Sequence, residues 1–337
     1  MCPKKVAIIY NEPAAGRYSQ VGEEKAELGV IDSVKAVHRA LGDLGYSVAR
    51  VPLLPPLEKA QETLKSLKVD LIFNLFEGFV DSPEAEAIIA DTLAELGIPY
   101  TGCPGAMLAL ALDKARTKAL LIANGIRTPK YQVLTPETVA SFQMNYPCIV
   151  KPVGEDASHG VSADSVVGDA AALARQVTKI SQIYGGRALV EEYVDGREFN
   201  ITVLGTRELD VLPISEIVFL LPPGFPRILT FEAKWEPKSP YFDSTKPICP
   251  ADIDSGLKEE IGNIARQAFR LLGGSGYIRL DLRTNDKGEP YVIEVNPNPD
   301  ISPGTGAARQ SKASGMTYSQ FMDKLIQLAL ERETQCK

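Results

Sequence analysis

The chain has 337 residues, 45% of them hydrophobic, and a formal net charge of -7. This length predicts two or three domains with enough apolar surface to fold unaided, and the negative charge disfavours general affinity for nucleic acid. The five cysteines lie far apart and only two histidines are present, which disfavours zinc and fits free thiols in a reducing cytoplasm. The apolar run 6–9 is too short for a signal-peptide core. We therefore expect a cytoplasmic protein with no membrane or nucleic-acid partner.

The N-terminal part predicts an open α/β unit. Its expected strands cover residues 4–10, 47–51 and 69–74, and its expected helices cover 31–44 and 83–96. Ser82 before Pro83 predicts the N-cap and first position of the second helix. No G-x-G-x-x-G sequence follows the first strand, so binding of NAD or FAD is disfavoured.

The middle of the chain predicts a helix at residues 107–125 and strands at 146–152 and 188–194. Lys151 ends the first of these strands and precedes the loop 154–160, whose glycines allow backbone N–H groups to approach a phosphate. Taken alone, Lys151 fits a solvated surface turn equally well. The glutamates Glu191, Glu192 and Glu198 read singly as solvated strand ends, and His159 as an exposed loop histidine.

Near the C-terminus, two strands each end in oxygen ligands. The first covers residues 277–281 and ends in Asp281, and the second covers 291–296 and brings Glu294 and Asn296. Two carboxylates and an amide, with no softer ligand nearby, suit a hard cation such as Mg²⁺, which usually completes its shell with substrate phosphates. This pattern predicts a nucleoside triphosphate as substrate. The last helix is expected at 317–330, with a capping box of Thr317 and Gln320.

Together these features resemble the motif series of the ATP-grasp superfamily, and within it the D-alanine–D-alanine ligase branch. The similarity covers nearly the whole chain in the family's order. The matching segments are 99–102, 112–118 around Lys114, 149–152 around Lys151, 189–192, 231–234 ending in Lys234, 279–281, 294–296, and the segment before the last helix. The resemblance implies an α/β (α+β) ATP-grasp fold of three domains: an N-terminal substrate domain at 1–104, a central subdomain at 105–190 and a C-terminal catalytic subdomain at 191–337.

The resemblance also implies roles for individual residues. ATP and two Mg²⁺ ions, with Mn²⁺ as an alternative ion, would be the cofactors. The nucleotide would be held by Lys114, Lys151, Lys234, Glu191, Glu192, Val194 and Glu198. The metal ligands would be Asp281, Glu294 and Asn296. Catalytic roles fall on Arg279, which would face the acyl oxygen, on Lys234, carried by a lid at 221–241, and on Ser158. The substrates would meet Arg279, Thr305, Trp235 and Asp300.

Several positions depart from the family. In the family, a serine, a tyrosine and a glutamate orient the first D-alanine. Here Ala157 stands at the serine position and Trp235 at the tyrosine position, and the glutamate position falls near Glu27. Glu23, Glu24 or Glu27 are alternatives that would rebuild the contacts. Asp300 stands where the family has glycine, and it offers a partner for a cationic group. Gly306 stands where the family prefers leucine, which predicts extra room for the second substrate.

We therefore expect an ATP-dependent carboxylate–amine ligase that forms an amide or dipeptide through an acyl phosphate and releases ADP and phosphate. Its partners would be a small-molecule carboxylate and an amine, both of the amino-acid class, and a homodimer is one candidate assembly. Three alternatives stay open. They are a D-alanine–D-alanine ligase of peptidoglycan precursor synthesis, an ATP-grasp carboxylase or kinase, and a non-catalytic nucleotide-binding regulator.

Overall fold

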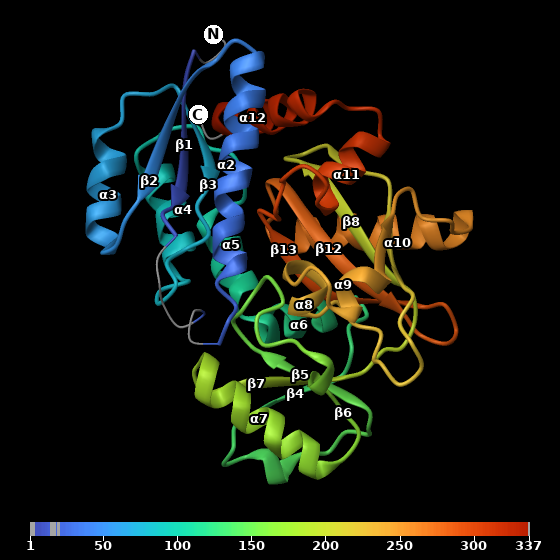
Figure 1. Cartoon of the computed structure of the whole chain (residues 1–337). Helices are drawn as coiled ribbons and strands as arrows, with labels where there is room; N and C mark the ends of the chain where they lie inside the picture. Colours follow the sequence, from blue (N-terminus) through green and yellow to red (C-terminus); the bar gives the residue numbers. More distant parts are fainter. Residues whose placement is uncertain (1–3, 14–17, 19–20, 336–337) are drawn as a thin grey trace.

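The structure is a computed structural model that describes residues 4–13, 18 and 21–335. The described strands form three sheets. Figure 1 shows the first in blue at the upper left, the second in green below, and the third in yellow to red at the right. None of the described helices combines the length and apolar character needed to cross a bilayer. The mixed α/β class expected from the sequence is confirmed.

The first sheet is parallel and comes from the N-terminal part of the chain. Its strands are β1 (Lys5–Asn11), β2 (Ser47–Leu53) and β3 (Leu71–Leu75), in the order β2-β1-β3. The helices of this part are α2 (Lys25–Asp43), α3 (Leu57–Ser66), α4 (Ala85–Glu95) and α5 (Gly105–Leu112). Every residue of β3 is buried, as expected for a strand of a covered parallel sheet. The three predicted strands are confirmed.

Three helix predictions in this region have wrong boundaries, the first being that α2 begins at Lys25 rather than at residue 31. Helix α4 begins at Ala85 rather than at Pro83, because the backbone of Ser82 pairs with that of Phe79 in both directions. The predicted single helix at 107–125 is two helices, α5 and α6 (Lys114–Ala123). Asp113 separates them, with an extended backbone and a side chain that accepts a hydrogen bond from Arg116 N. An N-cap at this position starts a new helix.

The second sheet is antiparallel and stands below the rest of the molecule in Figure 1. It consists of β4 (Tyr131–Leu134), β5 (Cys148–Pro152), β6 (Val166–Val167) and β7 (Ala188–Glu192), in the order β4-β7-β5-β6. Helix α7 (Ala170–Tyr184) and two short 3₁₀ helices, η1 (Val139–Ser141) and η2 (Ala163–Ser165), complete this part. The strands predicted to hold Lys151 and Glu191 are therefore neighbours in one sheet.

The third sheet carries the C-terminal strands. They are β8 (Glu198–Gly205), β9 (Leu209–Val211), β10 (Ser215–Phe219), β11 (Thr245–Ile248), β12 (Gly276–Thr284) and β13 (Pro290–Pro297). The path is β11-β10-β8-β12-β13, with β9 pairing β8. The helices are α8 (Phe231–Trp235), α9 (Pro240–Ser244), α10 (Ser255–Leu271), α11 (Gly306–Ala313) and α12 (Tyr318–Gln335). The capping box of Thr317 and Gln320 is confirmed, with hydrogen bonds of 2.8 and 3.2 Å.

Two apolar cores are shared between the first and third sheets, and a third core belongs to the second sheet. One core joins Ile72 of β3 with Ile278 of β12, and another joins Ile8 of β1 with Leu325 of α12. The second sheet has a core of its own, formed by residues such as Val150 and Val177. The first and third sheets are therefore packed as one body, and the second sheet stands apart from it. The predicted domain limits at 104 and 190 stay predictions.

Candidate functional site

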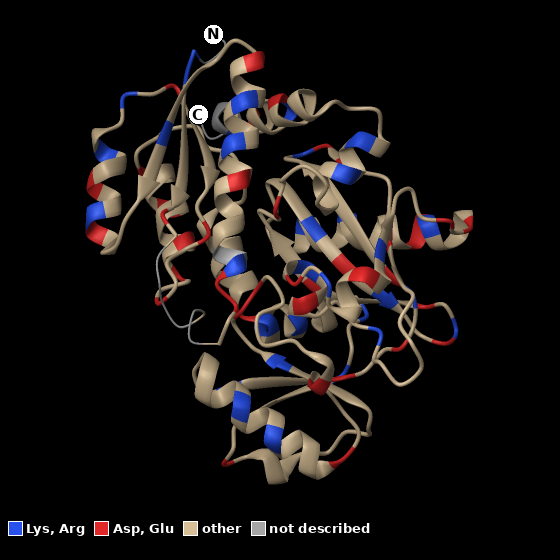
Figure 2. Ribbon diagram, viewed as in Figure 1, with Lys and Arg blue, Asp and Glu red and all other residues tan. Residues whose placement is uncertain are grey.

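A cleft opens where the second sheet meets the third. The empty space in it is about 860 Å³, including space open to solvent. The cleft is lined by eleven residues named in the sequence analysis, namely Lys114, Lys151, Ser158, His159, Glu191, Glu192, Val194, Glu198, Lys234, Asp281 and Glu294. Figure 2 shows basic positions on α6 and β5 at this junction. Arg279, Asn296, Trp235, Asp300 and Thr305 lie outside the lining.

Two carboxylates face each other across the third sheet. Asp281 on β12 pairs in register with Glu294 on β13, and like charges directly opposite each other destabilise a sheet. Cations compensate here: Arg279 Nε and Nη2 donate to the two oxygens of Asp281 at 2.8 and 2.9 Å. Asn296 Nδ2 also donates to Asp281, at 3.0 Å. The structure thus brings Asp281, Glu294 and Asn296 together, and their role as metal ligands stays a prediction.

Lysines from three different elements surround Glu294. Lys114 Nζ lies 3.0 Å from Glu294 Oε1 and 3.0 Å from Asp156 Oδ1. Burial opposes ionisation of Glu294, but Lys114, Lys151 and Lys234 outweigh it and lower its pKa to about 2. Burial and the nearby Arg279 lower the pKa of Lys234. The ammonium group of Lys234 forms no hydrogen bond or ion pair with the described residues, so it is available to an anionic ligand.

A buried carboxylate on β7 contacts Lys151 and one further lysine, Lys118. Glu191 is 1% exposed, and its oxygens contact Lys118 and Lys151, the latter at 2.6 Å. Burial raises the pKa of Glu191, but the two lysines outweigh this and lower it. Burial lowers the pKa of Lys118 to about 8. Sequence reasoning gave Lys118 no role, although its spacing of four residues from Lys114 places both on one face of α6.

The outer part of the cleft carries a second pair of opposite charges, Glu198 and Arg283. The sequence analysis named only Glu198. Glu198 on β8 lies opposite Arg283 on β12, with Oε2 and Nε 3.9 Å apart. Burial raises the pKa of Glu198. Arg283 received no role, although alternation along β12 puts residues 279, 281 and 283 on one face. The side chain of Glu192, at the end of β7, is exposed.

The loop between β5 and η2 is held by its neighbours. Ala157 and Ser158 have φ values of 53° and 64°, a strained conformation for residues other than glycine. Ser158 Oγ donates to Leu229 O at 3.1 Å, which ties the loop to the segment before α8.

The expectation of an exposed His159 is wrong. This side chain is 4% exposed, and its ring stacks on Tyr18 with centroids 3.9 Å apart. His159 Nδ1 lies 2.8 Å from Glu23 Oε2, and Tyr184 donates to the same oxygen at 2.7 Å. Glu23 is thus the N-terminal glutamate that reaches the loop, whereas the side chain of Glu27 is outside the described part.

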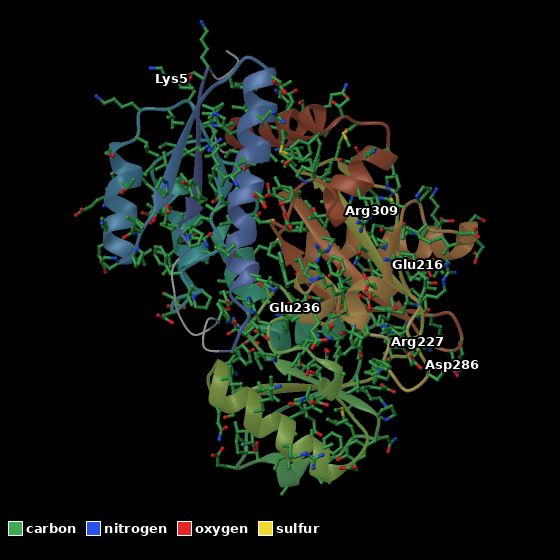
Figure 3. All side chains as sticks on the ribbon, viewed as in Figure 1. Lys5, Glu216, Arg227, Glu236, Asp286 and Arg309 are labelled. Carbon is green, nitrogen blue, oxygen red and sulfur yellow. The ribbon has the colours of Figure 1, made fainter. Side chains whose placement is uncertain are left out.

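The segment expected to act as a lid, 221–241, packs against this loop through Trp235. Trp235 Nε1 is 3.4 Å from Ala157 O, so the two replaced family positions meet through a backbone carbonyl. A Cβ on Gly29 of α2 would come within 3.1 Å of the Trp235 ring, which shows how closely the helix and the lid pack. Lys25 pairs with Glu236 at 2.7 Å, and Figure 3 shows Glu236 beside the lower end of α2.

The start of α11 approaches Arg279. Thr305, the N-cap residue, donates to Asp300 O at 2.9 Å and Ser302 O at 2.8 Å. A Cβ on Gly306 would lie 3.3 Å from Arg279 Cδ. The predicted extra room at Gly306 is therefore wrong, because the Arg279 side chain fills it.

Comparison with known proteins decides the family. The family model for the D-ala D-ala ligase C-terminus matches residues 120–327. The chain belongs to the D-alanine–D-alanine ligase family. It is 30% identical to a D-alanine–D-alanine ligase of Alcanivorax borkumensis over 92% of both chains. It is also 30% identical to the uncharacterized protein y4sG of Sinorhizobium fredii over 97% of both.

Solved structures of the D-alanine–D-alanine ligase family share the fold. The ATP complex of the Bacillus anthracis D-alanine–D-alanine ligase superposes with a TM-score of 0.75 at 22% identity, covering 99% of this chain and 100% of that one. The VanG D-Ala:D-Ser ligase of Enterococcus faecalis gives 0.73 at 24% identity, covering 97% and 99%. The predicted ATP-grasp fold is confirmed. As a family member, the chain is an ATP-dependent ligase that joins a carboxylate to an amine.

Proposed function

We propose that the cleft binds ATP with its polyphosphate among Lys114, Lys151 and Lys234. The adenine would lie along the backbone that follows Glu191, through Val194, and Glu198 would receive the ribose hydroxyls. The observation that carries this proposal is the convergence of three lysines on Glu294 within one cleft. Lysine ammonium groups form strong, charge-assisted contacts with phosphate oxygens.

Magnesium fits the oxygen donors of this cleft. Asp281, Glu294 and Asn296 offer only hard ligands, and in the described part of the chain no group of three or more His, Cys, Asp or Glu side chains forms a protein cage. Mg²⁺ needs only one or two carboxylates when phosphates and water complete its shell. When bound, the ions would neutralise charge that develops on the phosphates.

The reaction would proceed in two steps. A carboxylate oxygen of the first substrate attacks the γ-phosphorus, the bond from that phosphorus to the bridging oxygen breaks, and ADP leaves. The amine nitrogen of the second substrate then attacks the acyl carbon, phosphate leaves with the electrons of the carbon–oxygen bond, and the nitrogen loses a proton. Arg279 would stabilise the oxyanion on the acyl carbon. Ser158, Trp235 and the closed lid would exclude water from the acyl phosphate.

We propose an amino-acid pair other than two D-alanines as the preferred substrates. The changes at Ala157, Trp235 and Asp300 support this choice, because a lost polar partner changes specificity strongly. D-alanine as both substrates is the alternative, and the names of relatives such as the Bordetella petrii D-alanine–D-alanine ligase favour it. The expected three domains remain part of the proposal, since the second sheet has a separate core.

A screen of amino-acid pairs tests this function. Each pair is incubated with ATP and Mg²⁺, ADP release is measured, and products are identified by mass. One pair should give an amide or dipeptide together with equal amounts of ADP and phosphate. ADP formed with a phosphorylated product, or with bicarbonate alone, would instead support the kinase or carboxylase alternative. Absence of nucleotide binding by calorimetry would overturn the proposal.

A further inference from the structure

Helix α6 carries two lysines that contact different sheets. Lys114 lies 3.0 Å from Glu294 in the third sheet, and Lys118, four residues later, contacts Glu191 in the second sheet. Figure 1 shows α6 at the junction of these two sheets. Lys114 lines the cleft, whereas Lys118 is not among the described residues of its lining. Any effect of Lys118 on a ligand must therefore pass through the side chains that it touches.

The ammonium group of Lys118 is enclosed by polar partners. This residue is 2% exposed, and its Nζ donates to Thr128 Oγ1 at 2.6 Å in addition to its contact with Glu191. Thr128 Oγ1 in turn donates to Val292 O at 2.7 Å, and Val292 N donates to Arg127 O at 2.8 Å. The threonine is thereby fixed to the backbone of β13. Lys118 is thus held in place from the third sheet while it contacts a carboxylate of the second.

The carboxylate of Glu191 is shared between two lysines. Its Oε1 contacts Lys118, and its Oε2 lies 2.6 Å from Lys151 Nζ. Of these two lysines, Lys151 is the one that lines the cleft. All three side chains are buried, so water screens their charges poorly and the Coulomb interactions among them are strong.

The charges of this set do not cancel. Two ammonium groups face one carboxylate, which leaves one positive charge in excess. Burial lowers the pKa of Lys118 to about 8, and this value keeps its ammonium group protonated at neutral pH. Without Lys118, the carboxylate of Glu191 would interact with Lys151 alone. A phosphate group would then have to compete with Glu191 for the ammonium group of Lys151.

Packing alone does not account for a lysine at position 118. Burial of an ammonium group opposes folding unless the group is paired, and an apolar side chain of similar volume often stabilises a core equally well. The charge of Lys118 is better explained by its effect on Glu191 and Lys151. That effect reaches the cleft through two printed-in-place contacts, from Lys118 to Glu191 and from Glu191 to Lys151.

We infer that Lys118 is a positioning residue for nucleotide binding: by sharing Glu191, it leaves Lys151 with a net positive charge for a phosphate group of ATP. The inference deepens the proposed function and rests on it, because it requires that Lys151 contact a phosphate. Lys118 itself touches no part of the ligand. Its contribution concerns the phosphates, and binding of the base and ribose does not depend on it.

Lys118→Met in the full chain tests the inference with two probes, MgATP and adenosine. Methionine has a similar length and no charge. MgATP affinity, measured by calorimetry, should fall roughly tenfold, the size of one charge-assisted contact. Adenosine carries no phosphate, so its affinity, measured by saturation-transfer NMR, should change less than about twofold. Lys118→Gln, which keeps a donor for Thr128 Oγ1, should behave in the same way and replaces Lys118→Met if that variant does not fold.

Arg116→Met is the matched control, because Arg116 is an exposed cation on the same helix. It should bind both probes like the wild type. Unchanged MgATP affinity in the variants of Lys118 would overturn the inference. Equal losses of MgATP and adenosine affinity would also overturn it, because they would show that the substitution distorts the cleft as a whole.

A second substitution separates charge from shape. Adding Glu191→Gln to the Lys118 variant removes the carboxylate that competes for Lys151, and it leaves no buried carboxylate short of a partner. MgATP affinity should therefore recover most of the roughly tenfold loss. A double variant that binds MgATP no more tightly than the single variant would show the inference to be wrong. Failure of the wild type to bind MgATP would instead overturn the proposed function, and the inference with it.

Discussion

Lys114 Nζ lies 3.0 Å from Glu294 Oε1, an ion pair that joins α6 to the last strand of the third sheet. Lys114 is 6% exposed, so each group relies on the other for compensation of its charge. Burial lowers the pKa of Lys114, but Asp156 and Glu294 outweigh this and raise it. According to the proposed function, this ion pair would separate when ATP binds. Lys114 would then contact the polyphosphate, and Glu294 would contact a metal ion. The pair keeps both groups ionised and in position beforehand.

Lys151→Ala should weaken binding of ATP roughly 10- to 100-fold, because it removes a charge-assisted phosphate contact. The variant also leaves Glu191 with Lys118 as its cationic partner. Calorimetry with MgATP measures the change. Lys179→Ala, an exposed lysine on α7, serves as control and should bind normally. Unchanged affinity in Lys151→Ala would remove the nucleotide from this part of the cleft.

Glu294→Gln should abolish turnover while the chain stays folded. Glutamine has nearly the same shape but cannot supply a negative charge to Lys114 or to a metal ion. ADP release at saturating Mg²⁺ and thermal unfolding by circular dichroism report the two properties separately. Near-normal ADP production by this variant would show that the strand pair β12–β13 does not hold the metal.

The stability of the wild type relative to Lys118→Met should rise with pH between about 8 and 10.5. Burial lowers the pKa of Lys118 from 10.5 to about 8 in the folded chain. In this pH window the unfolded chain binds the extra proton, so stability increases as pH rises. The full difference amounts to about 3 kcal/mol at most. Urea unfolding across this range gives the free energies, and a flat difference would contradict the assigned shift.

Gly306→Ala should lower kcat without altering ATP affinity. The added methyl would lie 3.3 Å from Arg279 Cδ, so Arg279 must shift away from its position beside Asp281. Gly42→Ala in α2 is the control, since a Cβ there meets no atom within 4 Å, and alanine favours a helix. Single-turnover kinetics separate chemistry from binding. A normal kcat in Gly306→Ala would show that the position of Arg279 tolerates this change.

With D-alanine as sole amino acid, kcat/KM should fall at least about tenfold below the best pair found in the screen. A missing polar partner at the first substrate costs about 1 to 3 kcal/mol, and Ala157 and Trp235 remove two such partners. Values within about tenfold of the best pair would show that contacts such as those of Glu23 rebuild the lost set.

The strand positions and the metal-type ligands were predictable because they follow from local patterns. The sequence analysis named Asp281 and Glu294 on two successive strands, and the structure pairs these residues in register. Lys118 was missed because its partner Glu191 lies on another element, in the second sheet. A helical spacing alone does not reveal which carboxylate a lysine will meet.

Long-range contacts explain the errors at His159 and Gly306. A histidine in a polar loop reads as exposed, and only the fold brings Glu23 and Tyr18 over it. A small residue reads as open space, and only the fold shows that Arg279 occupies it. The division of the predicted helix 107–125 has a local cause that the sequence contains, because Asp113 is a typical N-cap residue.

The shared core of β1 and α12 bears on how the chain folds as it is made. Ile8 packs in one cluster with Phe321 and Leu325, so the first strand leaves the ribosome long before its packing partners exist. Exposed apolar surface of this kind attracts chaperones and promotes aggregation. The core between β1 and α12 can therefore be completed only when the last helix has been synthesised. The core of the second sheet contains no residue of the last helix, so it can form before that helix is made.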